Sequence, residues 1–239
     1  MAFTLSPGPD EAAFSANLER VRASIASAAA KAGRDPGGIA LVAVTKNFDV
    51  PALALAHRNG LRLFGENRVQ EAQYKMPQLP GGISWRLIGH LQSNKAPLAA
   101  KLFDAVDSVD SAKLVSLLDR HAGEAGKRLE IMLEVNVADE PRKSGVPFSA
   151  VPALADAARE ARHLELKGLM CVPPAVENPE DVRAYFARLR ALAERLELPE
   201  LSMGMSGDYA VAVEEGATMV RLGTALFGRR TPPPAERSA

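Results

Sequence analysis

The chain has 239 residues, of which 47% are hydrophobic and 24% charged, the proportions of a globular protein with a buried core. Its 29 basic and 29 acidic residues balance to a net charge of +0, so the sequence predicts no binding of nucleic acid or of an anionic membrane. The one cysteine, Cys171, excludes an internal disulfide and CxxC metal sites, and fits a reducing compartment. Signal-peptide features and apolar runs of about 20 residues are absent from the sequence, so we expect a cytoplasmic protein.

The two ends of the chain differ from the rest. Residues 1–9 and 231–239 are rich in proline and small polar residues, and we expect both to be disordered. Residues 10–32 predict a helix that stops at Gly33, because apolar side chains recur there at helical spacing: Phe14, Leu18, Val21 and Ile25.

Between these ends, short β-rich runs alternate with helical patterns. The expected strands are 39–45, 61–64, 84–88, 104–108, 130–136, 164–170, 200–203 and 217–221. The helices between them begin near Pro51, Asn67, Lys95, Ser111, Ser149, Pro179 and Asp208. This alternation predicts an α/β protein, with residues 10–230 forming a single (β/α)8 TIM barrel that carries an extra N-terminal helix. A doubly wound open sheet is the alternative, but even spacing and phosphate-type loops after the last two strands favour the barrel.

Those two loops are the most informative part of the sequence. Ser206-Gly207 and Gly223-Thr224 each offer main-chain N–H groups and a hydroxyl without side-chain bulk, which is what a phosphate dianion requires. Between them, Arg221 ends an apolar strand, where an unpartnered charge would be costly.

A lysine ends the first strand. Lys46 follows the apolar run Ile39 to Thr45, and desolvation near another cation lowers the pKa of a lysine and makes its amine nucleophilic. The alternative is a strand-end lysine that extends to water. Together with the phosphate-type loops, Lys46 suggests a phosphorylated aldehyde held as a Schiff base.

Polar side chains also follow the middle strands. Asn67 and His90 lie where barrel active sites are built, although Asn67 could be a helix N-cap and His90 a structural histidine. We expect Ser108 and Asp110 to be structural, and Asn136 either to bind a ligand or to hold the following loop.

Other chemistries have little support. The four histidines show no metal-ligand spacing, and neither a GxSxG elbow nor a GxGxxG motif after the first strand is present. We therefore predict no metal site and no catalytic residues. The thiol and thioethers of Met170, Cys171, Met203 and Met205 are expected in the core or the cavity wall.

Several long motifs, in order along residues 10–230, carry a family resemblance. They include Ala43-Val-Thr-Lys46, Phe64-Gly-Glu-Asn-Arg-Val-Gln-Glu71, Trp85–Lys95, Val135-Asn136 with Lys143-Ser-Gly145, Gly168-Leu-Met170, Leu201–Asp208 and Gly216–Thr224. The chain thereby resembles the pyridoxal phosphate homeostasis proteins, also called the proline synthetase co-transcribed homologues. The resemblance implies a fold-type III barrel related to the N-terminal domain of alanine racemase, with pyridoxal 5'-phosphate (PLP) as cofactor.

The resemblance also assigns roles to residues of this chain. Lys46 would form the aldimine with the cofactor. Its phosphate would be cradled by Ser206, Gly207, Gly223 and Thr224. Arg221 would face the pyridine nitrogen, and Asn67 and His90 would line the ring site. The chain departs from the family pattern at Asn47-Phe48-Asp49, commonly Thr-Lys-Pro, and at Arg68, frequently aromatic.

An arginine at the pyridine nitrogen would keep that nitrogen deprotonated and weaken the cofactor as an electron sink. We therefore expect a carrier that buffers or delivers PLP in vitamin B6 homeostasis, with apo PLP-dependent enzymes as recipients, and not an enzyme. The alternatives are a small amino-acid racemase and a Schiff-base aldolase. Because the sequence shows no exposed apolar stripe, we expect a monomer or weak dimer.

Overall fold

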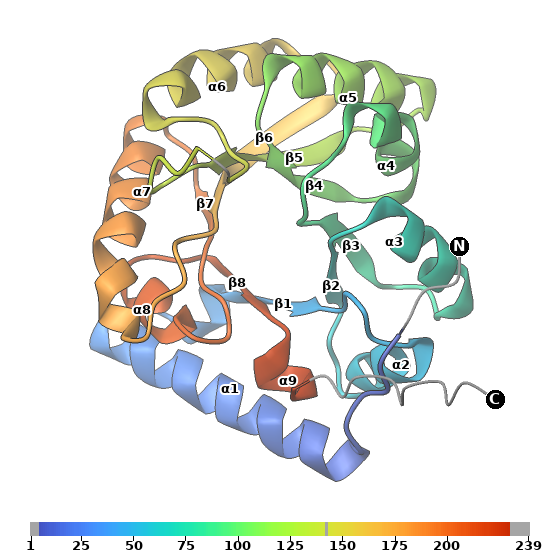
Figure 1. Cartoon of the computed structure of the whole chain (residues 1–239), viewed down its shortest axis with the longest axis vertical. Coiled ribbons are helices and arrows are strands. Elements are labelled where there is room, and N and C mark those ends of the chain that lie inside the picture. The colour runs from blue at the N-terminus through green and yellow to red at the C-terminus, as the bar shows by residue number, and fades with distance from the viewer. Residues whose placement is uncertain (1–4, 142, 230–239) are drawn as a thin grey trace, which may run out of the picture.

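The computed structural model describes residues 5–141 and 143–229. Eight parallel strands form a closed barrel in the order β1-β2-β3-β4-β5-β6-β7-β8. Figure 1 looks down this ring, with helices around its outside. The strands are β1 Ala40–Val44, β2 Leu63–Glu66, β3 Ser84–Leu87, β4 Ala105–Val109, β5 Leu129–Val135, β6 Leu164–Cys171, β7 Glu200–Ser202 and β8 Met219–Leu222. The prediction of a barrel instead of an open sheet is confirmed, because β1 pairs with β8.

The helices are α1 Glu11–Lys31, α2 Val50–Arg58, α3 Val69–Lys75, α4 Ala96–Leu102, α5 Ala112–Glu124, α6 Val151–Glu160, α7 Arg183–Arg195, α8 Tyr209–Glu214 and α9 Thr224–Phe227. Short 3-10 turns cover 36–38, 76–78, 93–95, 148–150 and 179–182. The predicted helix starts lie close to these. The short helix α9 is an addition that the sequence analysis did not predict.

The extra N-terminal helix, α1, covers one side of the barrel. Its N-cap Asp10 accepts a hydrogen bond from the N–H of Ala13 at 2.8 Å, and Gly33, with a φ of 65°, follows its end. The apolar positions predicted at helical spacing are buried. Figure 1 shows α1 running beside α8 and α9.

Residues 1–9 were predicted to be disordered. Within them, Ser6 is instead held by main-chain hydrogen bonds. The main-chain N–H of Ser6 donates to the carbonyl oxygen of Asn47 at 2.7 Å, and its carbonyl accepts from Asp49 at 3.0 Å. Ser6 is buried as a result. The expectation of disorder for residues 1–4 and 231–239 lies outside the described residues.

The barrel interior changes in character along its axis. Val42, Met132, Met170 and Met219 form an apolar cluster inside the ring. Successive strand side chains alternate between the two faces, so residues two positions further along also face the interior, nearer the carboxyl ends of the strands. These positions are Val44, Glu134, Val172 and Arg221, and they form a more polar layer above the cluster.

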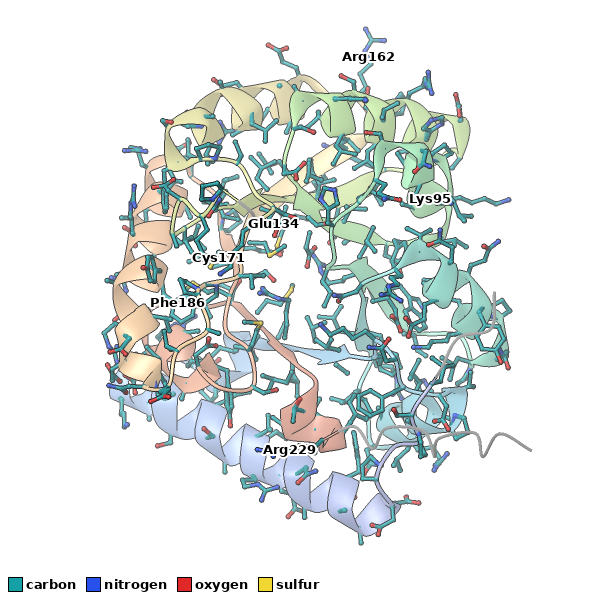
Figure 2. All side chains as sticks on the ribbon, viewed as in Figure 1. Lys95, Glu134, Arg162, Cys171, Phe186 and Arg229 are labelled. Atoms are coloured by element: carbon teal, nitrogen blue, oxygen red, sulfur yellow. The ribbon has the colours of Figure 1, made fainter. Side chains whose placement is uncertain are left out.

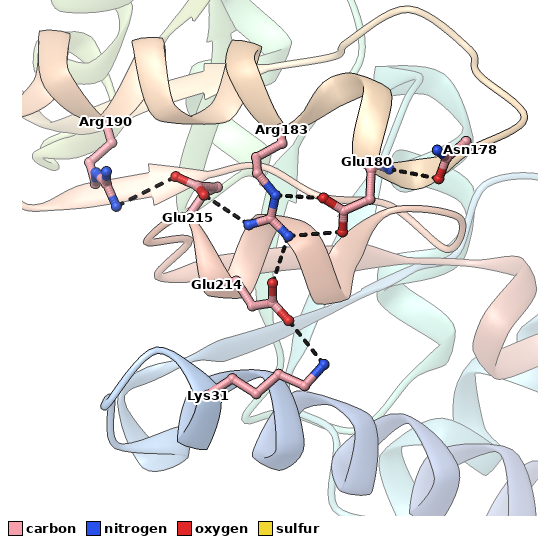
Figure 3. Close-up of polar contacts among 7 residues, drawn as sticks. All are labelled: Lys31, Asn178, Glu180, Arg183, Arg190, Glu214 and Glu215. Atoms are coloured by element: carbon pink, nitrogen blue, oxygen red, sulfur yellow. Dashed lines mark hydrogen bonds and ion pairs between the residues drawn. The ribbon is translucent and has the colours of Figure 1, made fainter.

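The end of α8 is fixed from outside the barrel. The Arg183 guanidinium donates to Glu214 at 2.7 Å, to Glu215 at 2.9 Å and to Glu180. Lys31 of α1 also pairs with Glu214, at 3.4 Å, and Figure 3 shows this network joining α1, α7 and α8. One exposed ion pair contributes little to stability, but Arg183 is shared by three carboxylates and so connects the start of α7 to the end of α8, to which Lys31 joins α1. The loop that precedes α8 is the predicted phosphate loop.

Candidate functional site

A cavity of about 390 Å³ lies at the carboxyl ends of the strands. In (β/α)8 barrels this end is where active and binding sites are built. Its lining residues are Val44, Lys46, Asn67, Ile88, Val172, Met205, Ser206, Gly207, Arg221, Gly223 and Thr224. Seven of the eight residues predicted for the cofactor site therefore lie around one cavity, and they come from the ends of β1, β2, β7 and β8.

Lys46 reaches the cavity because of strand alternation. Val42, Val44 and Lys46 are two residues apart along β1 and its continuation, so they face the same side. Val42 belongs to the interior cluster, and Lys46 is half-buried in the cavity wall above it.

Arg221 is held rigidly at the cavity floor. Its guanidinium donates from Nη1 to the Ser202 hydroxyl at 2.8 Å and from Nη2 to the main-chain carbonyl of Cys171 at 2.7 Å. The residue is 4% exposed, and burial lowers the pKa of Arg221, while nearby carboxylates, including Glu134, act in the opposite direction. The charge predicted at the end of β8 therefore has partners at the ends of β7 and β6.

The two small-residue loops are bound to each other. The Ser206 hydroxyl accepts a hydrogen bond from the N–H of Ala225 at 3.1 Å, which connects the loop after β7 to α9. Asp208 closes the first loop by accepting from the N–H of Met205 at 2.6 Å. A Cβ placed on Gly207 would meet no atom within 4 Å, so the main chain there borders open space. This is the geometry of a cradle for a ligand group.

Gly204 allows this loop to pack on α8. Its φ is 93°, and a Cβ there would lie 2.6 Å from the Cβ of Ala212. Its carbonyl accepts from the N–H of Arg221 at 3.0 Å, so the same residue aligns the loop with β8.

His90, which was predicted for the same site, does not line this cavity. It lies at a neighbouring hollow of about 260 Å³ that shares Asn67 and also includes Arg68 and Lys95. Its side chain is 54% exposed, with Nδ1 3.6 Å from Asp110. The preceding Gly89 packs against the main chain of Asn67, where a Cβ would lie 2.5 Å from the carbonyl oxygen, and the chain leaves the cavity wall at that point.

The structure also shows the surroundings of the remaining polar residues. Asn67 lines the cavity and does not cap α3, whose N-cap is Arg68. Asn136 is structural, because its side chain exchanges two hydrogen bonds with the main chain of Glu140, at 2.8 and 3.1 Å. Ser108 is structural as well, since its hydroxyl donates to the Gly89 carbonyl at 2.7 Å.

Glu134 is a buried acid that the sequence analysis missed. It follows Met132 by two residues on β5 and so faces the barrel interior, where Figure 2 labels it near the inner rim of the ring. Its Oε2 atom has no hydrogen-bond partner among the described residues. Burial and the Asp110 carboxylate raise the pKa of Glu134 to about 7, against the opposing effect of Arg221.

The described residues contain neither a cluster of three potential metal ligands nor a helix long and apolar enough to cross a membrane.

Comparisons with known proteins identify the family of this chain. The family model for the alanine racemase N-terminal domain matches residues 10–231. The pyridoxal phosphate homeostasis protein of Pseudomonas aeruginosa is 44% identical over 219 residues, which cover 90% of this chain and 94% of that protein. The chain belongs to this family.

Solved structures of similar proteins support the assignment. PipY of Synechococcus elongatus PCC7942, in a structure with PLP bound, is 39% identical, with a TM-score of 0.73 over 85% of this chain and 100% of that one. An unknown protein from Bifidobacterium adolescentis is 32% identical, with a TM-score of 0.85 over 95% of this chain and 100% of that one. The resemblance to the pyridoxal phosphate homeostasis proteins is confirmed.

The departure of this family member at Asn47-Phe48-Asp49 has structural roles. Asn47 adopts a φ of 63°, a left-handed conformation that asparagine tolerates better than most residues. The Phe48 ring packs 4.7 Å from that of Phe227, and Asp49 caps α2 by accepting from the N–H of Ala52 at 3.0 Å.

The raised pKa of Glu134 generates a testable pH dependence. In the unfolded chain a glutamate ionises near its ordinary pKa, so the folded protein binds the extra proton between about pH 4.5 and 7. Stability should therefore fall as pH rises through this window, by at most about 3 kcal/mol. Glu134→Gln should abolish this fall, measured by urea unfolding of both proteins from pH 5 to 8. Parallel stability curves for the two proteins would contradict the assignment.

Proposed function

We propose that this protein binds PLP in the cavity and serves PLP homeostasis by buffering or delivering the cofactor. The single observation that carries the proposal is the meeting of an amine, a guanidinium and two small-residue loops in one cavity. The names of its relatives support the same reading, since the Pseudomonas aeruginosa protein is named for PLP homeostasis and a PipY structure has PLP bound.

When bound, PLP supplies an aldehyde that condenses with an amine, forming a carbon–nitrogen double bond with loss of one water. In this proposal Lys46 provides that amine. Asn67 borders the same part of the cavity and has donors and an acceptor for a polar ring substituent. Val44, Ile88 and Val172 provide the apolar walls that a flat aromatic ring requires.

The phosphate would lie at the loops after β7 and β8. Gly207 and Gly223 expose main-chain N–H groups without side-chain bulk, and Ser206 and Thr224 add hydroxyl donors. The Ser206–Ala225 hydrogen bond holds the loops together, so both can contact one anion.

Arg221 would orient the ring by donating to its pyridine nitrogen. A guanidinium only donates hydrogen bonds and stays protonated, so it would leave that nitrogen without a proton. The bonds to Ser202 and Cys171 fix its plane before any ligand binds. An unprotonated ring withdraws electrons less strongly, which favours holding the cofactor over turning substrate over.

The ionisable groups that line the cavity also favour a carrier. Among the described residues that line it, Lys46 and Arg221 are the ionisable ones. Racemisation through two bases needs a second acid–base group on the opposite face of the substrate. We therefore propose a carrier instead of an amino-acid racemase.

An exchange experiment separates these two functions. With PLP-loaded protein and alanine in heavy water, the proposal predicts no protein-dependent loss of the Cα proton signal by nuclear magnetic resonance. Incorporation of deuterium above the rate given by free PLP would instead assign racemase chemistry to the site.

Replacement of Lys46 tests the binding mode. Lys46→Ala should lose the covalent, borohydride-reducible adduct with PLP but retain weaker binding through the phosphate loops, measured by absorbance and equilibrium dialysis. Lys95→Ala, at the neighbouring hollow, is the matched control and should label as the wild type does. Unchanged labelling of Lys46→Ala would remove Lys46 from the proposed role.

A further inference from the structure

Three charged side chains are buried together behind β1 and β2. Glu66, at the end of β2, and Lys75, at the end of α3, have fully buried side chains, and that of Glu71 is 1% exposed. The three form ion pairs through Lys75 Nζ, at 2.8 Å to Glu66 and 2.6 Å to Glu71. We refer to Glu66, Glu71 and Lys75 as the buried clamp. None of the three lines the cavity.

The clamp binds the main chain on the N-terminal side of Lys46. Lys75 Nζ donates to the carbonyl oxygen of Thr45 at 2.7 Å. With the two carboxylates, this gives the ammonium three acceptors for its three N–H groups. The Thr45 hydroxyl donates in turn to Glu66 at 2.7 Å.

The clamp also binds the main chain on the C-terminal side of Lys46. Glu71 Oε1 accepts from the N–H of Asn47, the residue with the left-handed φ of 63°. The peptide units on both sides of Lys46 are thus hydrogen-bonded to one rigid, charge-paired group. A lysine side chain has four rotatable bonds, so the direction in which its amine projects is set first by this main chain.

We propose that Glu66, Glu71 and Lys75 are positioning residues that fix the main chain around Lys46 and thereby aim its amine at the cofactor aldehyde. This inference rests on the proposed function, in which the Lys46 amine forms a carbon–nitrogen bond with the aldehyde and one water leaves.

The energetics favour a positioning role over a purely stabilising one. Burying charged groups costs desolvation free energy, and an apolar cluster of similar volume often stabilises a core as well or better. Burial also raises the pKa of Glu66, whose Oε2 has no partner among the described residues. A second buried ion pair, Arg86 with Asp107, joins two side chains and, among the described residues, has no hydrogen bond to the main chain next to Lys46. The clamp differs because it binds the main chain next to Lys46.

The test separates covalent capture from ordinary binding. Lys75→Met removes the ammonium and its bond to Thr45 with little change in volume. We expect the rate of PLP capture, followed by absorbance, to fall about tenfold or more, as small misplacements of reacting groups do. Binding of pyridoxine 5'-phosphate, which has the ring and phosphate but no aldehyde, should stay unchanged.

A second measurement needs no ligand. In Lys75→Met, the Asn47 amide proton should exchange with solvent faster than in the wild type.

Leu118→Ala is the matched control. Leu118 is fully buried in α5, remote from β1 in the barrel, so its truncation destabilises the fold without touching the clamp. It should leave the capture rate unchanged, and it should speed Asn47 exchange no more than that of other protected amides in the barrel. If Lys75→Met does not fold, Glu71→Met/Lys75→Met replaces the ion pair with apolar side chains and removes the bonds on both sides of Lys46.

Wild-type capture rates in a folded clamp variant would overturn the positioning role. Equal losses of pyridoxine 5'-phosphate binding and PLP capture would overturn it too, because they would indicate general damage to the cavity. A wild-type protein that captures no PLP would instead overturn the proposed function, while Asn47 exchange would still report whether the clamp holds the main chain.

Discussion

The pairing of β1 with β8 closes the barrel, and the site exists only because of that closure. Val42 lies opposite Arg221 and Ala43 opposite Leu222 in the parallel register. This register brings the end of β1, with Lys46, beside the loop that begins at Gly223. An open sheet with its strands in chain order would leave β1 and β8 at opposite edges. The amine and the phosphate loops are thus neighbours by topology.

Closure of the barrel also buries polar side chains that face its interior. The apolar cluster of Val42 and three methionines fills the middle of the barrel, and the next layer carries Arg221 and Glu134. Arg221 donates hydrogen bonds to the Ser202 hydroxyl and the Cys171 carbonyl, whereas one carboxylate oxygen of Glu134 has no partner among the residues described. Since buried polar groups normally find partners, such a group costs stability at the floor of the site.

Rigid supports surround this layer. The Arg183 network fixes α8 from outside, Asp208 closes the loop before it, and the buried clamp holds the end of β1 (Figure 3 shows the first of these). These three sets of contacts hold the loops and the strand end that form the cavity wall. A site built in this way is ready to bind a ligand without rearrangement, which reduces the entropy lost on binding.

The sequence predicted much of this architecture because its signals are local. Apolar β-rich runs that alternate with helical patterns predicted the number and order of the strands. The prediction differs at β2, which begins two residues later than expected, at Leu63. Lys46 and Arg221 were predicted because each ends an apolar strand, and the glycine-containing loops because phosphate binding depends on main-chain geometry; the structure places all of them around one cavity.

The rest depends on contacts between distant segments. Glu71 fits a capping pattern and Lys75 lies four residues later, so the sequence suggests a surface pair and gives no sign that both are buried against Thr45 and Asn47. In the sequence, Glu134 is one residue of a predicted strand, and only the closed barrel shows that its side chain faces the interior. His90 was assigned to the ring site by the family resemblance, but its side chain lies at the neighbouring hollow, and the sequence alone does not distinguish these two positions.

The most direct test of the account is peptide mass mapping of the wild-type protein after PLP loading and borohydride reduction. The account predicts one predominant reduced adduct, on Lys46. An adduct predominantly on Lys95 or Lys143, or no adduct at all, would contradict the claim that the cavity at the ends of β1 and β8 is the cofactor site.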